Sequence, residues 1–266
     1  MLYEEDYLKK VNFIYGDVRD QKLLQKFLNW ADSVVWIAAI VGDGACAINH
    51  SLTTDVNYKS VEFLSKNFLG RIVFFSTCSV YGAQNNLLDE RSKTNPLSLY
   101  ASTKLQAEEI LKNKNAIIFR LGTLFGLGDS YSRIRMDLVL NTLTLKAFNE
   151  NRLVVYGGKQ YRPLLHVKDA AEAIILALNN NKVCGIFNLH YQNVKILDLA
   201  LRIKNFFKKI KIEKVNVKFQ DIRNYRVTGK KVFDALNFKP KFSGAIYSLR
   251  DVLINSYCFS QLSLKF

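Results

Sequence analysis

Two residues of this sequence have the types and spacing that proton transfer requires. Tyr100 precedes Lys104 by four positions, so on a helix both side chains project from the same face. A phenol has a reference pKa of about 10, and a lysine ammonium one turn away favours its anion. The pair therefore predicts a general base that works near neutral pH. The hydroxyl of Thr77 could hold a substrate oxygen while Tyr100 moves its proton.

The segments around these residues predict how they come together. The apolar run 71–75 predicts a buried parallel strand, and small hydroxylated residues follow it directly. A strand of this kind ends at the mouth of a sheet, which places Thr77 there. Further along, Ser98 can cap a helix that carries Tyr100 and Lys104.

Two motifs resemble the active-site signature of a known enzyme family in both order and spacing. They are Ser76-Thr-Cys-Ser-Val-Tyr-Gly82 and Leu99-Tyr-Ala-Ser-Thr-Lys104. The sequence is similar to the extended short-chain dehydrogenase/reductases, specifically the NAD-dependent nucleotide-sugar epimerase/dehydratase group of the UDP-glucose 4-epimerase type. The resemblance implies a catalytic set of Thr77, Tyr100 and Lys104. It also implies NAD as cofactor, with NADP left open, a nucleotide-sugar substrate and a possible homodimer.

Shorter motifs resemble the cofactor-binding positions of the same family. The turn Gly16-Asp-Val18 is similar to the family's turn beside the adenine ring, and Thr123 stands where the family commonly has Asn. The cofactor-binding residues that the resemblance implies are Asp17, Val18, Ala38, Ala39, Asn57, Tyr100, Lys104 and Thr123.

Two arginines are candidates for the diphosphate of the substrate. Arg162 lies in a segment that resembles the family's R-x-x-I-H-V-x-D element, which implies contact with the sugar-nucleotide diphosphate. Arg223 is the second candidate because an arginine fork suits paired phosphate oxygens. Asn141, near the start of a predicted helix, is a further candidate for substrate contact.

The residues after Thr77 bear on the reaction. Cys78 and Ser79 are expected to contact the substrate, and they stand where sugar-nucleotide dehydratases carry Asp and Glu for water elimination. Neither is a carboxylate, which argues against a 4,6-dehydratase. Hydride transfer at a sugar carbinol carbon remains, in an epimerase or a simple dehydrogenase/reductase. The segments 38–46 and 135–141 resemble a subgroup that acts in surface-polysaccharide or heptose-nucleotide pathways.

Strands that alternate with helices predict an α/β fold, a doubly wound parallel (Rossmann-like) sheet with a smaller α+β substrate lobe. We expect residues 1–130 and 163–190 to form the NAD-binding portion, and residues 131–162 and 191–266 to form the lobe. The ranges predicted as strands or helices at the two ends of the chain are 11–15, 31–39, 195–208, 215–219 and 244–258.

The family's glycine-rich turn, which receives the pyrophosphate at a helix N-terminus, does not occur in the sequence. The sheet is therefore expected to lack its first β-α-β part. We expect a truncated product of an epimerase-like gene that binds dinucleotide poorly in isolation. Two alternatives stay open: another chain supplies the missing part, or the protein is a degenerate, non-catalytic member that has lost dinucleotide binding.

Composition narrows the class of protein. The 266 residues carry a net charge of +15, but the lysines are spread along the chain and their densest stretch, 202–218, has an amphipathic helix pattern. We therefore expect no nucleic-acid partner. No apolar run is long enough to span a bilayer, which predicts a cytoplasmic protein without a membrane partner. No metal site or disulfide framework is expected from the scattered Cys46, Cys78, Cys184 and Cys258.

Overall fold

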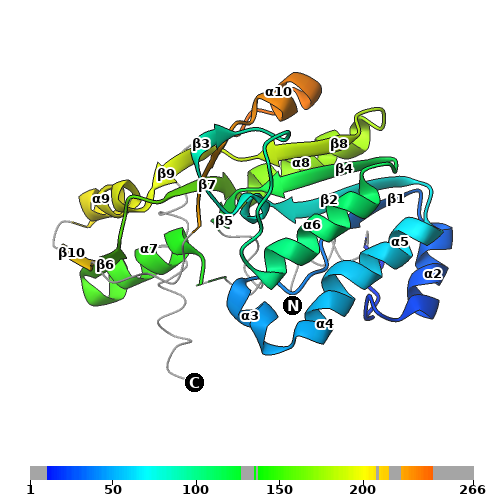
Figure 1. Cartoon of the computed structure of the whole chain (residues 1–266), viewed down its shortest axis with the longest axis horizontal. Coiled ribbons are helices and arrows are strands. Elements are labelled where there is room, and N and C mark those ends of the chain that lie inside the picture. The colour runs from blue at the N-terminus through cyan, green and yellow to red at the C-terminus, as the bar shows by residue number, and fades with distance from the viewer. Residues whose placement is uncertain (1–10, 127–134, 136, 208–209, 216–222, 242–266) are drawn as a thin grey trace.

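The computed structural model describes residues 11–126, 135, 137–207, 210–215 and 223–241 of the chain (Figure 1). Its largest sheet is parallel and four-stranded, in the order β1 (Ser33–Trp36), β2 (Arg71–Thr77), β4 (Ala116–Leu121) and β8 (Gly185–Leu189). The strands are short runs rich in Val, Ile and Phe, which suit a sheet buried on both faces. The predicted α/β fold with a parallel sheet is confirmed.

Helices cover both faces of this sheet. In chain order they are α2 (Gln21–Trp30), α3 (Asp43–Ile48), α4 (His50–Thr54), the π-helix η1 (Asp55–Lys59), α5 (Ser60–Asn67), α6 (Leu99–Leu111), α8 (Val167–Asn179) and α10 (Lys230–Leu236). Side chains alternate along β2: Ile72 and Phe74 pack with α2, α5 and α6, whereas Val73 packs with α8 and α10. No helix in the described part of the chain is long and apolar enough to cross a membrane.

A second core lies at one end of the sheet. Its elements are α7 (Val139–Glu150), β6 (Arg152–Tyr156), α9 (Ile196–Phe206) and β10 (Lys211–Val215), which Figure 1 shows together on the left. The helix predicted near 195–208 is therefore confirmed as α9. Most of the strand predicted at 215–219, and the helix predicted near 244–258, fall outside the described residues. The predicted division into two lobes stays a prediction.

Short strands connect this second core to the main sheet. They are β3 (Ala83–Leu88), which pairs with β11 (Asn224–Val227), and β5 (Thr123–Phe125), β7 (Tyr161–His166) and β9 (Gln192–Lys195), which form a three-stranded sheet. The 3-10 helix η2 (Cys78–Tyr81) lies between β2 and β3. Gly82 ends η2 at φ +71, and an added Cβ would meet the Asn95 carbonyl oxygen at 2.0 Å, so this turn requires glycine.

The strand predicted at 11–15 is wrong. Residues 11–16 form no strand, and the side chains of Phe13 and Tyr15 are 80% and 92% exposed. A strand needs a hydrogen-bonded neighbour, and β1 pairs only with β2 among the described residues. β1 itself is shorter than the predicted range 31–39 for the same reason, since its apolar ends have no second strand to pair with in this part of the structure.

His190, directly after β8, makes stability depend on pH. Its Nδ1 is buried without a hydrogen-bond partner among the described residues, and burial lowers its pKa to about 4. The unfolded chain, with a pKa near 6.5, binds the proton more tightly, so the contribution of neutral His190 is complete above pH 6.5 and is lost as the pH falls towards 4. We expect about 2 kcal/mol of unfolding free energy to be lost through this group between pH 7.5 and 5.

Urea unfolding at these two pH values measures the effect. In the variant His190→Gln the part of the acid loss that belongs to this group should disappear. An equal acid loss in variant and wild type would show that His190 does not carry the effect.

Candidate active site

The end of β2 meets α6 at consecutive residues. The Phe75 carbonyl accepts a hydrogen bond of 2.8 Å from Lys104 Nζ, and the Thr77 side chain lies beside Tyr100, where it acts to lower the pKa of the phenol. Ser98 caps α6 as predicted, with its Oγ accepting from the Ala101 amide. The strand and helix predicted from the sequence thus bring Thr77, Tyr100 and Lys104 together.

A cavity of about 590 Å³ opens at this place. Apolar side chains, including Ile37, Phe75 and Leu121, form part of its wall. The residues singled out from the sequence that line it are Thr77, Tyr100, Lys104, Ala39, Ser79, Thr123, Arg162 and Arg223. The structure therefore gathers eight of the candidate residues, from segments far apart in the chain, around one space.

The pKa of Tyr100 and the contacts of Lys104 differ from what the sequence predicted. Burial raises the pKa of Tyr100 to about 12, and the opposing effects of the Thr77 hydrogen bond and the Arg135 guanidinium do not offset it. The expected lowering by Lys104 is wrong in this structure, where the ammonium binds the Phe75 carbonyl and lies 4.6 Å from the centre of the Phe74 ring. Tyr100 is therefore protonated at neutral pH and can donate its proton.

The pKa of Lys104 also departs from its usual value. Its side chain is only 2% exposed, and burial lowers its pKa to about 8, against the raising effect of the Glu108 carboxylate. The ammonium form thus still predominates at pH 7, close to the pH at which it would lose its proton.

Several candidates do not line this cavity. The Cys78 thiol is buried and donates to the Arg120 carbonyl, and burial raises its pKa. The Asn141 amide donates to the Arg135 carbonyl, so it supports the segment that carries Arg135. Thr77 and Ser79 line the cavity, whereas Cys78, the first residue of the 3-10 helix η2, packs into a hydrophobic cluster with Tyr81.

The predicted cofactor residues that do not line this cavity lie in two places. Asn57 exchanges hydrogen bonds with both backbone groups of Ile40 and also reaches Thr103 on α6, so it fixes the loop after β1 against that helix. Ala38 packs in the hydrophobic core between the main sheet and helices α2, α5 and α6. Asp17 and Val18 line a second cavity of about 550 Å³, beside α2. A cofactor contact by any of these residues stays a prediction.

Among the lining residues that were not chosen from the sequence, four have ionisable side chains: Asp43, Arg135, Asp137 and Tyr225. Tyr225 is buried, 3.1 Å from the Ser79 hydroxyl, and its ring faces Arg162 at 5.7 Å. The only sequence signal was local, because Tyr225 and Arg223 share one polar and aromatic segment. Their contact with η2 depends on the pairing of β11 with β3, which a single sequence does not reveal.

Several cationic side chains line the cavity, and each arginine among them binds a carboxylate or a backbone carbonyl. Arg223 pairs with Asp43 at 3.1 Å, and Arg135 Nε donates to Asp137 at 2.7 Å. Arg162 donates to the Tyr161 and Arg223 carbonyls. With Lys104, four cations and two carboxylates line the space, so its net charge suits an anionic ligand.

Comparison of the sequence with models of known protein families shows which family the chain belongs to. The model of the NAD dependent epimerase/dehydratase family matches residues 3–189, well over half of the chain. The chain belongs to this family. The resemblance seen in the two motifs around Thr77 and Tyr100 is thereby confirmed.

Curated relatives support the same family. The chain is 30% identical over 193 residues to a putative UDP-glucose 4-epimerase of Methanocaldococcus jannaschii, which covers 66% of this chain and 62% of the relative. It is 29% identical over 177 residues to an N-acetyl-alpha-D-glucosaminyl-diphospho-ditrans,octacis-undecaprenol 4-epimerase of Escherichia coli O157:H7, covering 62% of this chain and 51% of that one. The matched part thus spans between half and two thirds of these epimerases.

Solved structures show the same fold. Pal from Bacillus thuringiensis superposes with a TM-score of 0.78 at 24% identity, over 90% of this chain and 82% of its own. The dTDP-glucose 4,6-dehydratase DesIV of Streptomyces venezuelae, solved with NAD bound, gives 0.77 at 21% identity, over 92% and 80%. The predicted Rossmann-like architecture of this epimerase/dehydratase family member is confirmed.

The cavity can be tested against the cofactor of this NAD-dependent family. An aromatic ring of nicotinamide size fits the apolar wall of Ile37, Phe75 and Leu121, and Lys104 supplies a buried ammonium donor beside it. Thr123 adds a hydroxyl at the end of β4. The described residues thus fit the nicotinamide end of the dinucleotide.

Proposed function

We propose that this chain carries the chemical centre of an NAD(P)-dependent nucleotide-sugar epimerase or oxidoreductase, which acts by hydride transfer at a sugar carbinol carbon. The observation that carries the proposal is the meeting of Thr77, Tyr100 and Lys104 at one cavity that Arg162 and Arg223 also line. Family membership supports the same reaction class.

Each side chain has a role in this proposal. Thr77 orients the substrate hydroxyl, and Tyr100 exchanges the proton of that hydroxyl. Lys104 holds the cofactor with its buried ammonium group. Bound NAD supplies the hydride acceptor and donor. Arg162 and Arg223 bind the diphosphate, as two guanidinium groups can.

The substrate class follows from charge and from the relatives. The cationic lining suits a nucleotide diphosphate, and a related structure, MoeE5, was solved in complex with UDP-glucose and NAD. The absence of carboxylates at positions 78 and 79 favours an epimerase or dehydrogenase/reductase over a 4,6-dehydratase. We place the activity in surface-polysaccharide sugar biosynthesis, in cytoplasm, as the resemblance of segments 38–46 and 135–141 suggests.

The test is a titration of the purified chain with NAD, followed by calorimetry and by thermal unfolding, and then repeated with UDP-glucose. A ligand that binds only the folded chain raises its unfolding temperature. We expect weak but saturable NAD binding that weakens further in Lys104→Met. The matched control is Lys112→Met, because Lys112 is exposed at the C-terminal end of the same helix and pairs only with Glu109 among the described residues.

Two results would count against the proposal. A folded chain that shows neither heat nor a shift with NAD would support the alternative of a non-catalytic family member. Equal weakening in the two lysine variants would mean that binding follows net charge and not the position of Lys104.

A further inference from the structure

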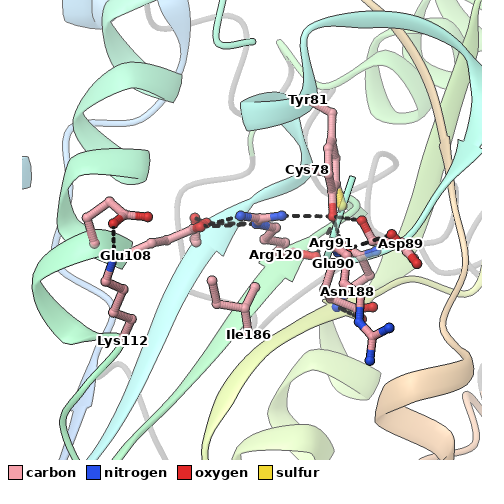
Figure 2. Close-up of polar contacts among 12 residues, drawn as sticks. Cys78, Tyr81, Asp89, Glu90, Arg91, Glu108, Lys112, Arg120, Ile186 and Asn188 are labelled. Atoms are coloured by element: carbon pink, nitrogen blue, oxygen red, sulfur yellow. Dashed lines mark hydrogen bonds and ion pairs between the residues drawn. The ribbon is translucent and has the colours of Figure 1, made fainter. Parts of the chain in front are cut away.

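A buried ion pair lies directly behind the candidate active site. Glu108 is 0% exposed and Arg120 is 3% exposed, and the guanidinium binds the carboxylate through Nε at 3.1 Å and through Nη2 at 2.6 Å. Burial acts to lower the pKa of Arg120, but the pairing with Glu108 outweighs it, so the pKa is raised and the pair is ionic. Figure 2 shows the two side chains meeting between α6 and the sheet.

This pair extends the contact between β2 and α6. Three consecutive residues at the end of β2 lie against α6: the Phe75 carbonyl accepts from Lys104, the Ser76 hydroxyl donates to Glu108, and the Thr77 side chain acts on the Tyr100 phenol. Tyr100, Lys104 and Glu108 are spaced four apart, so they form one stripe of the helix. Glu108 is thus the third member of the stripe that carries the proposed chemistry.

The remaining nitrogen of the Arg120 guanidinium links, through the Tyr81 hydroxyl, to the loop that precedes α6. Arg120 Nη1 donates to the Tyr81 hydroxyl at 2.9 Å. That hydroxyl lies 2.8 Å from the Asp89 carbonyl oxygen and 2.8 Å from Asn188 Oδ1, and donates to one of them. Arg120 therefore ties the loop before Tyr100 to the middle of the helix, through contacts that Figure 2 shows in one line.

Glu108 also acts on Lys104 electrostatically. The groups that face Lys104 from the elements around it are Tyr100 and Glu108 on α6, Cys46 on α3 and the Phe75 carbonyl on β2. Burial lowers the pKa of Lys104, and Glu108 is the first of the groups that raise it. The carboxylate thus helps to keep a buried lysine protonated near neutral pH.

We propose that Glu108, held by Arg120 and Ser76, is a positioning residue that fixes the Lys104 ammonium against the Phe75 carbonyl and sets the charge around it. This rests on the proposed function, because it assigns Lys104 to the chemistry. Glu108 does not itself line the cavity, so it acts through Ser76 and Lys104, which do.

The experiment reads Lys104 directly, without turnover. The purified chain is labelled at the lysine side chains, and their NMR signals are followed with pH; the signal missing in Lys104→Met assigns the residue. In Glu108→Gln we expect the titration midpoint of Lys104 to fall by about one unit, a tenfold loss of proton affinity. The matched control is Glu109→Gln, because Glu109 is the exposed neighbour on the same helix and should leave the midpoint unchanged.

A second variant covers the case in which Glu108→Gln leaves Arg120 unpaired and the chain does not fold. Glu108→Gln combined with Arg120→Met removes both charges, and the Lys104 midpoint should still fall. Glu108→Asp keeps the carboxylate and should restore most of the midpoint.

An unchanged midpoint in a folded variant that lacks the carboxylate would overturn the proposal. A fall in the midpoint together with a chain that never binds NAD would support the role of Glu108 and reject the proposed function instead. If the chain does turn over, the alkaline limb of kcat/KM should move with the Lys104 midpoint.

Discussion

Tyr100→Phe should abolish turnover and leave ligand binding nearly intact. The substitution removes one hydroxyl, which lies beside Thr77, and keeps the ring in place. General acid–base groups contribute roughly 10²–10⁴-fold to rate, so we expect a loss of at least that order in kcat. KM and the NAD-induced shift in unfolding temperature should change little. The measurement is turnover of UDP-glucose with NAD present.

A matched tyrosine separates chemistry from packing. Tyr225 also lines the cavity and hydrogen-bonds to Ser79, but it is assigned no proton transfer. Tyr225→Phe should therefore alter KM more than kcat. If Tyr100→Phe turned over at the wild-type rate, Tyr100 would have no part in the mechanism.

Arg120→Met should be among the most destabilising single substitutions in the chain. It leaves the Glu108 carboxylate buried without its cation, and breaking a buried pair in this way costs about 3–5 kcal/mol. The shift of the urea midpoint, at an unchanged denaturant slope, measures the loss. Removing the second charge as well, in Glu108→Gln with Arg120→Met, should recover a large part of it.

An exposed ion pair serves as the comparison for the buried Glu108–Arg120 pair. Arg152 binds Glu213 with both side chains about half exposed, at 55% and 51%. Arg152→Met should change the unfolding free energy by less than about 1 kcal/mol, because exposed ion pairs in water are weak. A similar loss in the two arginine variants would mean that burial does not set the strength of the Glu108–Arg120 pair.

The sequence predicted the parts of the site that local rules control. Ser98 caps its helix and Tyr100 and Lys104 share a face because spacing and capping are decided within a few residues. The end of β2 was placed correctly because a continuous apolar run marks a buried parallel strand.

What the sequence did not predict depends on contacts between distant segments. Nothing near position 120 indicates that its guanidinium meets Glu108, or that the Tyr81 hydroxyl receives its other end. The pKa of Tyr100 was misjudged because spacing indicates which charge is near, whereas burial, which outweighs it here, comes from the whole fold. The strand expected at 11–15 fails for a related reason, since an apolar run alone provides no partner for its backbone.

The contact between three successive residues of β2 and the stripe of α6 has a consequence for folding. Side chains alternate along a strand, so a slip of β2 by one residue against β4 would turn Ser76 and Thr77 to the wrong faces and separate every contact at once. The reactive groups are therefore assembled by the same event that sets the register of the sheet. A chain with this strand out of register would therefore lose all three contacts together.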